Sequence, residues 1–149
     1  MNHQLDGSTL SAQDMQDIDQ YLAKIEQIIS GKLVSLTGEE RQRYASVNEQ
    51  NKLFINKIKA FRESNPTSTN ICPDIDWAAF EEDYQKREFL ETRLSRLESL
   101  AYDFKSSKIA HDYRNMQDSL LFYRYSEYCA SAKKSGAVEL NNELKQFFK

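Results

Sequence analysis

Residues 77–135 read WAAFEEDYQKREFLETRLSRLESLAYDFKSSKIAHDYRNMQDSLLFYRYSEYCASAKKS and contain neither glycine nor proline. A β-sheet needs turn residues at short intervals, because its strands are short and are joined by turns. A stretch of this length without such residues therefore predicts helix throughout. The whole chain of 149 residues has only four glycines and two prolines, so helix is also the expectation outside this stretch.

Apolar side chains recur three and four residues apart along the stretch, which is typical of a helix that buries a narrow stripe. The spacing is interrupted once, because five positions separate Phe104 from Ile109. Ser106–Ser107 lies in the interruption, and we expect a helix–helix turn there rather than a kink. An unbroken helix of this stretch would be about 88 Å long and could not close a compact domain. The two runs are Phe80, Arg87, Leu90, Leu94, Leu97, Ala101, Phe104 and Ile109, Tyr113, Met116, Leu120, Tyr123, Glu127, Ala130.

The ends of the other helices are marked by capping residues. Ser11 with Asp14 and Thr37 with Glu40 both have the spacing of a capping box, and Gly31 is placed to end the first helix. Residues 64–76 form the one long connection, which we expect to cross the bundle end as a strap pinned by Ile71, Ile75 and Trp77. The expected helices cover approximately residues 11–30, 38–63, 77–105, 108–134 and 137–148.

These elements predict an all-α fold, an antiparallel up-down four-helix bundle with a short fifth C-terminal helix. The length fits a single helical-bundle domain over residues 1–149. The seam of the second expected helix is Tyr44, Val47, Asn51, Phe54, Ile58 and Phe61, with Ile55 widening it.

Composition excludes several classes of function. The net charge is −3, so there is no basic footprint for nucleic acid. No apolar run is long enough to span a membrane, and the polar segment Met1–Leu10 lacks the apolar centre of a secretory signal. We expect a cytoplasmic protein whose two cysteines, Cys72 and Cys129, are free thiols.

Catalytic and metal-binding motifs are missing as well. A di-iron bundle uses Glu-x-x-His pairs, but the residue three positions before His111 is Lys108, and the other histidine is His3. There is no glycine-rich phosphate loop, HExxH, CxxC or GxSxG motif. We therefore expect no metal and no cofactor, and the sequence favours a non-enzymatic protein.

One polar layer stands out, because Asn51, Arg87 and Glu127 each interrupt an apolar seam. Arg87 and Glu127 lie about 20 residues on either side of the expected turn, which would place them at the same height in the bundle. One interpretation is a buried Arg–Glu pair that sets the register of the helices. The other is a small polar pocket for a ligand, which would make the protein a small-molecule-binding bundle or an enzyme.

Aromatic residues are concentrated near the C-terminal end. Phe122, Tyr125 and Tyr128 point in different directions around one helix and cannot all face the same core. They are either covered on several sides by neighbouring helices, or they form an exposed surface that binds a protein partner. With Phe147 and Phe148 from the last helix, they are our candidate interface of a homodimer.

Two segments, Leu36–Ile58 (LTGEERQRYASVNEQNKLFINKI) and Lys108–Tyr125 (KIAHDYRNMQDSLLFYRY), resemble uncharacterised helical proteins of bacteria of the Bacteroidetes type. The resemblance covers about a third of the chain. It implies a bacterial cytoplasmic setting and brings no activity or site residue. The expected function is therefore protein–protein contact, most simply self-association.

Overall fold

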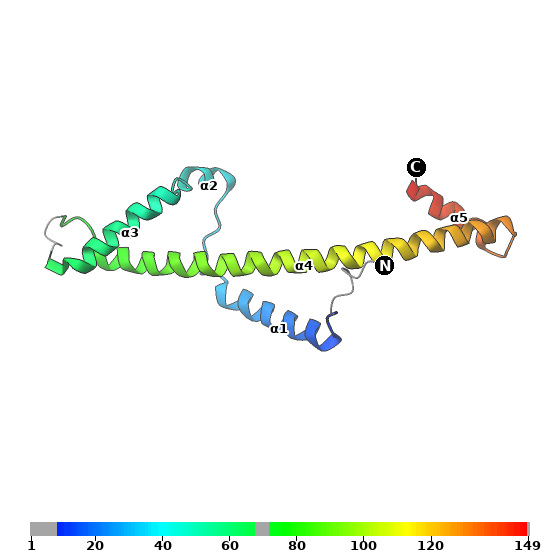
Figure 1. Cartoon of the computed structure of the whole chain (residues 1–149), viewed down its shortest axis with the longest axis horizontal. Coiled ribbons are helices and arrows are strands. Elements are labelled where there is room, and N and C mark those ends of the chain that lie inside the picture. Colours follow the sequence, from blue (N-terminus) through cyan, green and yellow to red (C-terminus); the bar gives the residue numbers. More distant parts are fainter. Residues whose placement is uncertain (1–8, 68–71, 149) are drawn as a thin grey trace. The chain divides into compact units, whose positions relative to one another are not determined.

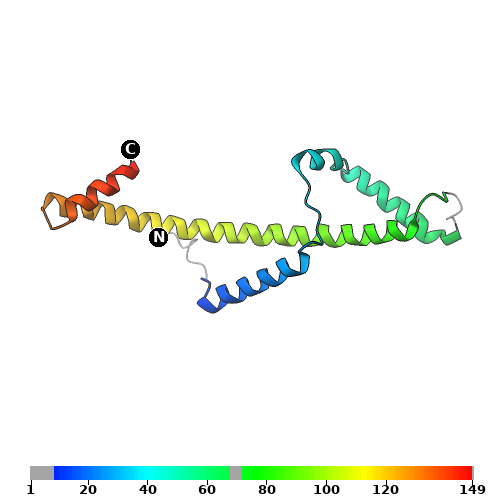
Figure 2. The same ribbon diagram turned by 180° about the vertical axis from the view of Figure 1, so that it is seen from behind.

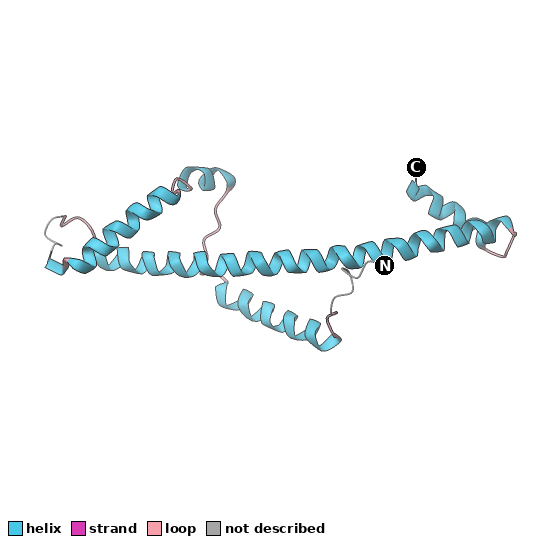
Figure 3. Ribbon diagram, viewed as in Figure 1, coloured by secondary structure: helices cyan, strands magenta, loops and turns pink. Residues whose placement is uncertain are grey.

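The computed structural model describes residues 9–67 and 72–148, and every regular element within these ranges is helical. This confirms the all-α class. The elements are α1 (Ala12–Ile29), α2 (Gly38–Tyr44), α3 (Glu49–Ser64), α4 (Trp77–Ser131) and α5 (Ala137–Lys145), followed by the 3-10 turn η3 (Gln146–Phe148) (Figures 1 and 3).

The chain divides into two compact units, with the boundary after Arg87 in α4. In the first unit, α3 folds back beside the first turns of α4. In the second, α5 folds back beside the last turns of α4, as both views show (Figures 1 and 2). The side chains described below as functional candidates lie mainly in these two helical hairpins and along α4.

Both expected capping boxes are confirmed. The Asp14 backbone N–H donates to Ser11 Oγ at 3.0 Å, and the Ser11 N–H donates to the Asp14 carboxylate at 2.8 Å. Thr37 and Glu40 exchange the same pair of hydrogen bonds at the start of α2. Gly31 follows α1 with a φ of +68°, the left-handed conformation that glycine adopts without steric cost.

The single helix expected over residues 38–63 is wrong, because residues 45–48 interrupt it. Asn48 caps α3, since its side-chain oxygen accepts a hydrogen bond from the Asn51 backbone N–H at 2.9 Å. The Asn51 side chain donates to the Ser46 carbonyl at 2.8 Å. Asn and Ser side chains compete with helical hydrogen bonds for backbone groups, and here these local bonds form a new helix start.

The turn expected at Ser106–Ser107 is also wrong, since α4 continues through it for 55 residues in total. The Ser106 hydroxyl donates to the Tyr102 carbonyl at 2.9 Å, one turn back, and so is satisfied inside the helix. Consequently the third and fourth helices of the expected bundle are one element.

The change of spacing has a different meaning. A strict seven-residue repeat drifts about 20° per repeat around a straight helix. From Leu90 to Glu127 the seam takes ten helical turns over 37 residues, which is 3.7 residues per turn. Even with the extra residue between Phe104 and Ile109, the average stays within about 0.1 of the 3.6 residues per turn of a straight helix, so no break is required.

The packed face of α3 differs from the expected seam. Its half-buried residues are Lys52, Ile55, Ile58, Lys59 and Arg62. The expected seam residues Phe54 and Phe61 are instead exposed. Part of the strap expected over residues 64–76 falls on residues 68–71, including Ile71, which lie outside the described residues.

The turn between α4 and α5 follows a helix-ending motif. The Lys134 N–H donates to the Cys129 carbonyl, and the Lys133 N–H donates to the Ala130 carbonyl, the two bonds of a Schellman motif. Lys133 holds the left-handed position of that motif with a φ of 53°. Gly136, with a φ of 72°, then begins α5.

Candidate functional site

The residues of the expected polar layer have separate roles. Asn51 is exposed in the first turn of α3, where its hydrogen bonds belong to the cap of that helix. Arg87 and Glu127 both lie on α4. The turn on which their equal height depended is absent, and 40 positions of continuous helix separate them. The structure therefore does not assemble the three residues as the layer that the sequence predicted.

Arg87 instead contacts α3. Its Nη2 donates to Asn56 Oδ1 at 3.4 Å, and the guanidinium lies over the Tyr84 ring, 4.9 Å from its centre. Arg87 Nε and Nη1 are buried and have no acceptor among the described residues. Leaving buried donors without hydrogen-bond acceptors is costly, so these contacts satisfy the Arg87 guanidinium only in part.

The Tyr84 ring is the centre of the α3–α4 contact. Its hydroxyl donates to Asn56 Oδ1 at 2.8 Å, and Lys59 Nζ lies 4.5 Å from the ring centre. Lys59 also forms ion pairs with Glu63 at 3.1 Å and with Glu81 at 3.6 Å. Its hydrogen bond to Glu63 is the main reason that the Lys59 pKa lies above its ordinary value, and the two carboxylates add to the effect.

Sequence reasoning did not find Asn56 and Lys59, because polar residues on a helix normally indicate a solvated face. The only available signal was that both lie within one turn of Ile55 and Ile58. Half-buried lysines place their apolar stems on the core and keep the charge at its edge.

A shallow depression of about 420 Å³ lies where the end of α3 meets the start of α4, lined by Arg62, Glu63, Pro66, Trp77, Ala78 and Glu81. The Arg62 guanidinium lies 5.4 Å from the centre of the Trp77 ring system, and Phe80 packs edge-on against Trp77 at 5.5 Å. These contacts secure the start of α4, and Asp76 Oδ1 caps it by accepting from the Ala79 N–H at 3.0 Å.

The α4–α5 hairpin contains the most deeply buried residues of the described chain. Asn141 Nδ2 donates to Ser126 Oγ at 3.0 Å, and both residues are 3% exposed. The Ser126 hydroxyl in turn donates to the Tyr123 carbonyl at 2.7 Å. Cys129 and Ala137 are buried beside this pair. The arrangement fixes α5 on α4 through a satisfied polar contact surrounded by small side chains.

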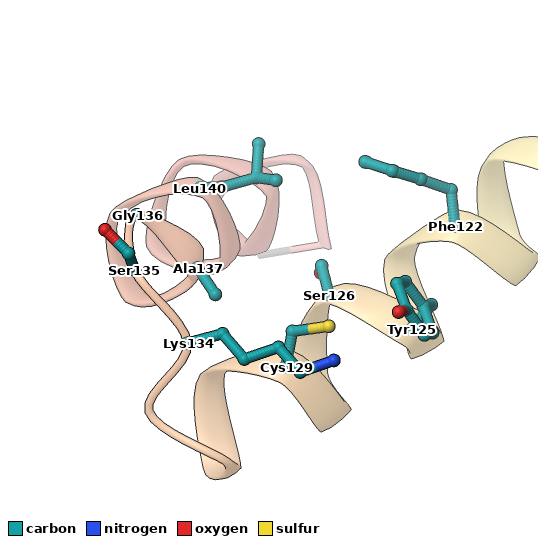
Figure 4. A pocket seen from close by; sticks show the side chains of 9 residues that line it. All are labelled: Phe122, Tyr125, Ser126, Cys129, Lys134, Ser135, Gly136, Ala137 and Leu140. Carbon is teal, nitrogen blue, oxygen red and sulfur yellow. The ribbon is translucent and has the colours of Figure 1, made fainter.

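A pocket of about 290 Å³ lies beside this contact. Figure 4 shows that Phe122 from α4 and Leu140 from α5 point toward one another across it. Its other lining residues are Tyr125, Ser126, Cys129, Lys134, Ser135, Gly136 and Ala137. The lining is mostly apolar, and the one charged side chain is Lys134, whose Nζ lies 5.6 Å from the Tyr125 ring centre.

The residues of the candidate aromatic interface are all exposed on this hairpin. Phe147 has the most accessible side chain of the group, at 83%. Tyr125 and Tyr128 lie side by side with ring centres 6.3 Å apart, and Phe148 stacks on Tyr123 at 4.7 Å. The Tyr123 pKa is raised, first by burial and then by the hydrogen bond to Glu127. Phe122 is also about half exposed.

A row of apolar residues runs along α4 in the second unit, and we call it the α4 seam. Its first half is Leu90, Leu94, Leu97, Ala101 and Phe104, and its second half is Ile109, Tyr113, Met116, Leu120 and Tyr123. From Leu90 to Met116 every residue of the seam is exposed. Only Leu120 and Tyr123, near α5, are half-buried.

Neither a metal site in the described residues nor a similar protein indicates the function. Among residues 9–67 and 72–148, no group of three or more His, Cys, Asp or Glu side chains is placed to hold a metal ion. In the same part of the chain, no helix is long and apolar enough to cross a membrane. No family model, curated protein or solved structure matches the chain.

Proposed function

We propose that this protein acts through protein–protein contact, and that its partner is a second copy of itself bound along the α4 seam. The observation that carries the proposal is the exposure of that seam. Leu94, Phe104 and Ile109 keep 56%, 51% and 57% of their surface accessible. Continuous apolar patches of this extent are rare on the surface of monomers and mark interaction sites.

The physical argument rests on what holds a long helix in water. Most of the stability of a protein helix comes from packing of its apolar face. The hairpin contacts with α3 and α5 involve the two ends of α4, whereas the seam between them lies open. A second α4 has the matching length and the same apolar side chains.

In this proposal a helical bundle is formed by two chains instead of one. A single chain does not supply the expected four helices, because α4 is one continuous helix. Two copies of α4, each with its own α3 and α5, supply them together. The aromatic residues Phe122, Tyr125 and Tyr128 lie outside the seam and are left as a second surface for contact.

Sedimentation equilibrium at micromolar concentration tests the proposal, and we expect a species of twice the 17.4 kDa of one chain. Leu97→Glu should weaken association at least about 50-fold, because each copy loses an exposed leucine from the symmetric contact and gains a charge there. Ser99→Glu adds the same charge two positions on, about 200° around the helix, and should leave the mass unchanged. A wild-type protein that sediments as a single chain rejects the proposal.

A further inference from the structure

We infer that the two copies pair through the α4 seam in antiparallel orientation, about a two-fold axis at the midpoint between Lys108 and Ile109. This inference rests on the proposed self-association and specifies its geometry. The first argument is that the seam is complementary to itself when reversed. Leu97 and Leu120 are equally far from the midpoint, and so are Phe104 and Tyr113.

The reversed seam also matches large residues with small or adaptable ones. Ala101, its smallest residue, faces Met116 of the second copy, and methionine adapts its shape to irregular gaps. Leu94 faces Tyr123 of the second copy. Because seam residues recur at an average of 3.7 per turn, slightly more than the 3.6 of a straight helix, the two helices coil gently around each other in the right-handed sense.

Charge at the ends of the seam selects the orientation. Arg87 lies one turn before Leu90, and Glu127 lies one turn after Tyr123. A parallel pair would place Glu127 against Glu127 of the second copy, and like charges at such a position are unfavourable. The antiparallel pair brings Glu127 to Leu90 of the second copy, one turn from the Arg87 guanidinium that has two N–H groups without described acceptors.

Charged residues beside the seam also favour the antiparallel orientation. Glu91 and Arg124 lie on the flank of the two halves, 17.5 and 15.5 positions from the midpoint, so that they meet between copies. In a parallel pair, the opposite charges that meet beside the seam would instead be Arg93 and Glu98 of the second copy. Exposed ion pairs of that kind contribute little, whereas opposed glutamates on the seam itself remain unfavourable.

The area is that of a stable dimer. The ten seam residues span 34 positions, which is roughly 50 Å of helix. One partner usually contributes about 800 Å² to a specific complex, and a seam of this length, with most of its large side chains about half accessible, offers an area of that order.

Disulfide trapping tests the orientation, in a full-length background with Cys72→Ser and Cys129→Ala. Leu97→Cys and Leu120→Cys are made as separate proteins. In the antiparallel pair, position 97 faces position 120 of the second copy, and two copies of position 97 lie 23 positions apart, roughly 34 Å. We expect crosslinked dimer when the two proteins are mixed and oxidised, and at least tenfold less when either is oxidised alone.

The outcomes separate this inference from the proposed function. Crosslinking of each variant alone shows a parallel pair and overturns the inference while keeping self-association. A dimeric mass without crosslinks in any sample places the contact elsewhere, for example on the aromatic surface, and also overturns it. A mass of 17.4 kDa for the unmodified protein rejects self-association itself.

A charge reversal provides a second measurement that does not depend on cysteine chemistry. Glu91→Arg or Arg124→Glu alone turns two attractive contacts of the symmetric pair into repulsive ones, and should raise the dissociation constant about 5- to 30-fold. The double variant should return to within about threefold of the wild type. If the double variant is as weak as the single variants, the two residues do not meet and the register is wrong.

Discussion

The buried contact between α4 and α5 makes a quantitative prediction for Asn141→Ala. The substitution removes the donor to Ser126 Oγ at a position that is 3% exposed. Leaving a buried group without its partner costs about 1–3 kcal/mol. The Ser126 hydroxyl retains its bond to the Tyr123 carbonyl, so the cost should be near the lower end, about 1–1.5 kcal/mol. At 1.4 kcal/mol per factor of ten, undocking of α5 becomes about tenfold more frequent.

Cys129 provides the assay, because its thiol is buried beside this contact. With Cys72→Ser as background, the rate of labelling by a thiol reagent reports the fraction of molecules in which α5 has separated. We expect about a tenfold faster rate for Asn141→Ala. Asn142→Ala is the matched control, since Asn142 is the adjacent residue of the same type and is exposed.

Removing both partners should cost less free energy than the sum of the two single substitutions. Ser126→Ala combined with Asn141→Ala leaves no stranded polar group, and the two effects should not add. Equal labelling rates for Asn141→Ala, Asn142→Ala and the wild type would show that the amide does not hold α5 in place. That result would refute the description of the hairpin.

Three further predictions concern local contacts. Tyr84→Phe removes the hydroxyl bond to α3 and should lower the free energy of unfolding by about 0.5–1.5 kcal/mol, measured by urea titration of the single tryptophan's fluorescence, whereas Tyr102→Phe, at a residue that is 72% exposed, should change nothing. Lys133→Gly relieves a left-handed residue and should stabilise the α4–α5 turn by about 1 kcal/mol, and a loss of stability there would contradict the turn assignment. The Ser11 backbone and side-chain hydrogen bonds hold the Asp14 pKa below its ordinary 3.8, so their contribution to α1 is complete above that pH and is lost as the pH falls through the lower folded pKa. Asp14→Asn should abolish this acid response of the α1 amide signals in NMR, and an Asp14 carboxyl that titrates at or above 3.8 would refute the cap.

The helical class and the caps could be predicted from local sequence, because they depend on residues three or four positions apart. Ser11 with Asp14, Thr37 with Glu40 and Gly31 all act within one turn. The seam residues of α4 could also be identified, since their spacing marks one face of a helix whatever that face contacts.

The sequence predicts the helix boundaries wrongly where a pattern is compatible with two structures. A one-residue change in seam spacing is compatible with a turn or with a straight helix, and the assumption of a compact single chain favoured the turn at Ser106–Ser107. The polar layer depended on that assumption, so Arg87 and Glu127 were paired within one chain. Asn51 was read as a seam residue because its role in the cap of α3 depends on Ser46 and Asn48.

The α3–α4 contact shows a limit of another kind. Tyr84 and Asn56 are 28 positions apart and meet only because the chain reverses between the two helices. Nothing in the local pattern of either helix specifies that pair. By contrast, the position of Lys59 over the ring follows once the reversal is known, because it lies one turn after Ile55 on the packed face.

The account depends most directly on α4 being a single helix that leaves its seam to a second copy. Spin labels at Ser99→Cys and Gln117→Cys, with Cys72→Ser and Cys129→Ala, would measure this by pulsed electron resonance in protein diluted with unlabelled chains. The two positions are five full turns apart on one face of α4, and neither is a seam residue, so we predict a backbone separation of about 27 Å. A separation below about 15 Å would mean that the chain turns back near Ser106–Ser107, and would contradict both the continuous helix and the interface proposed along it.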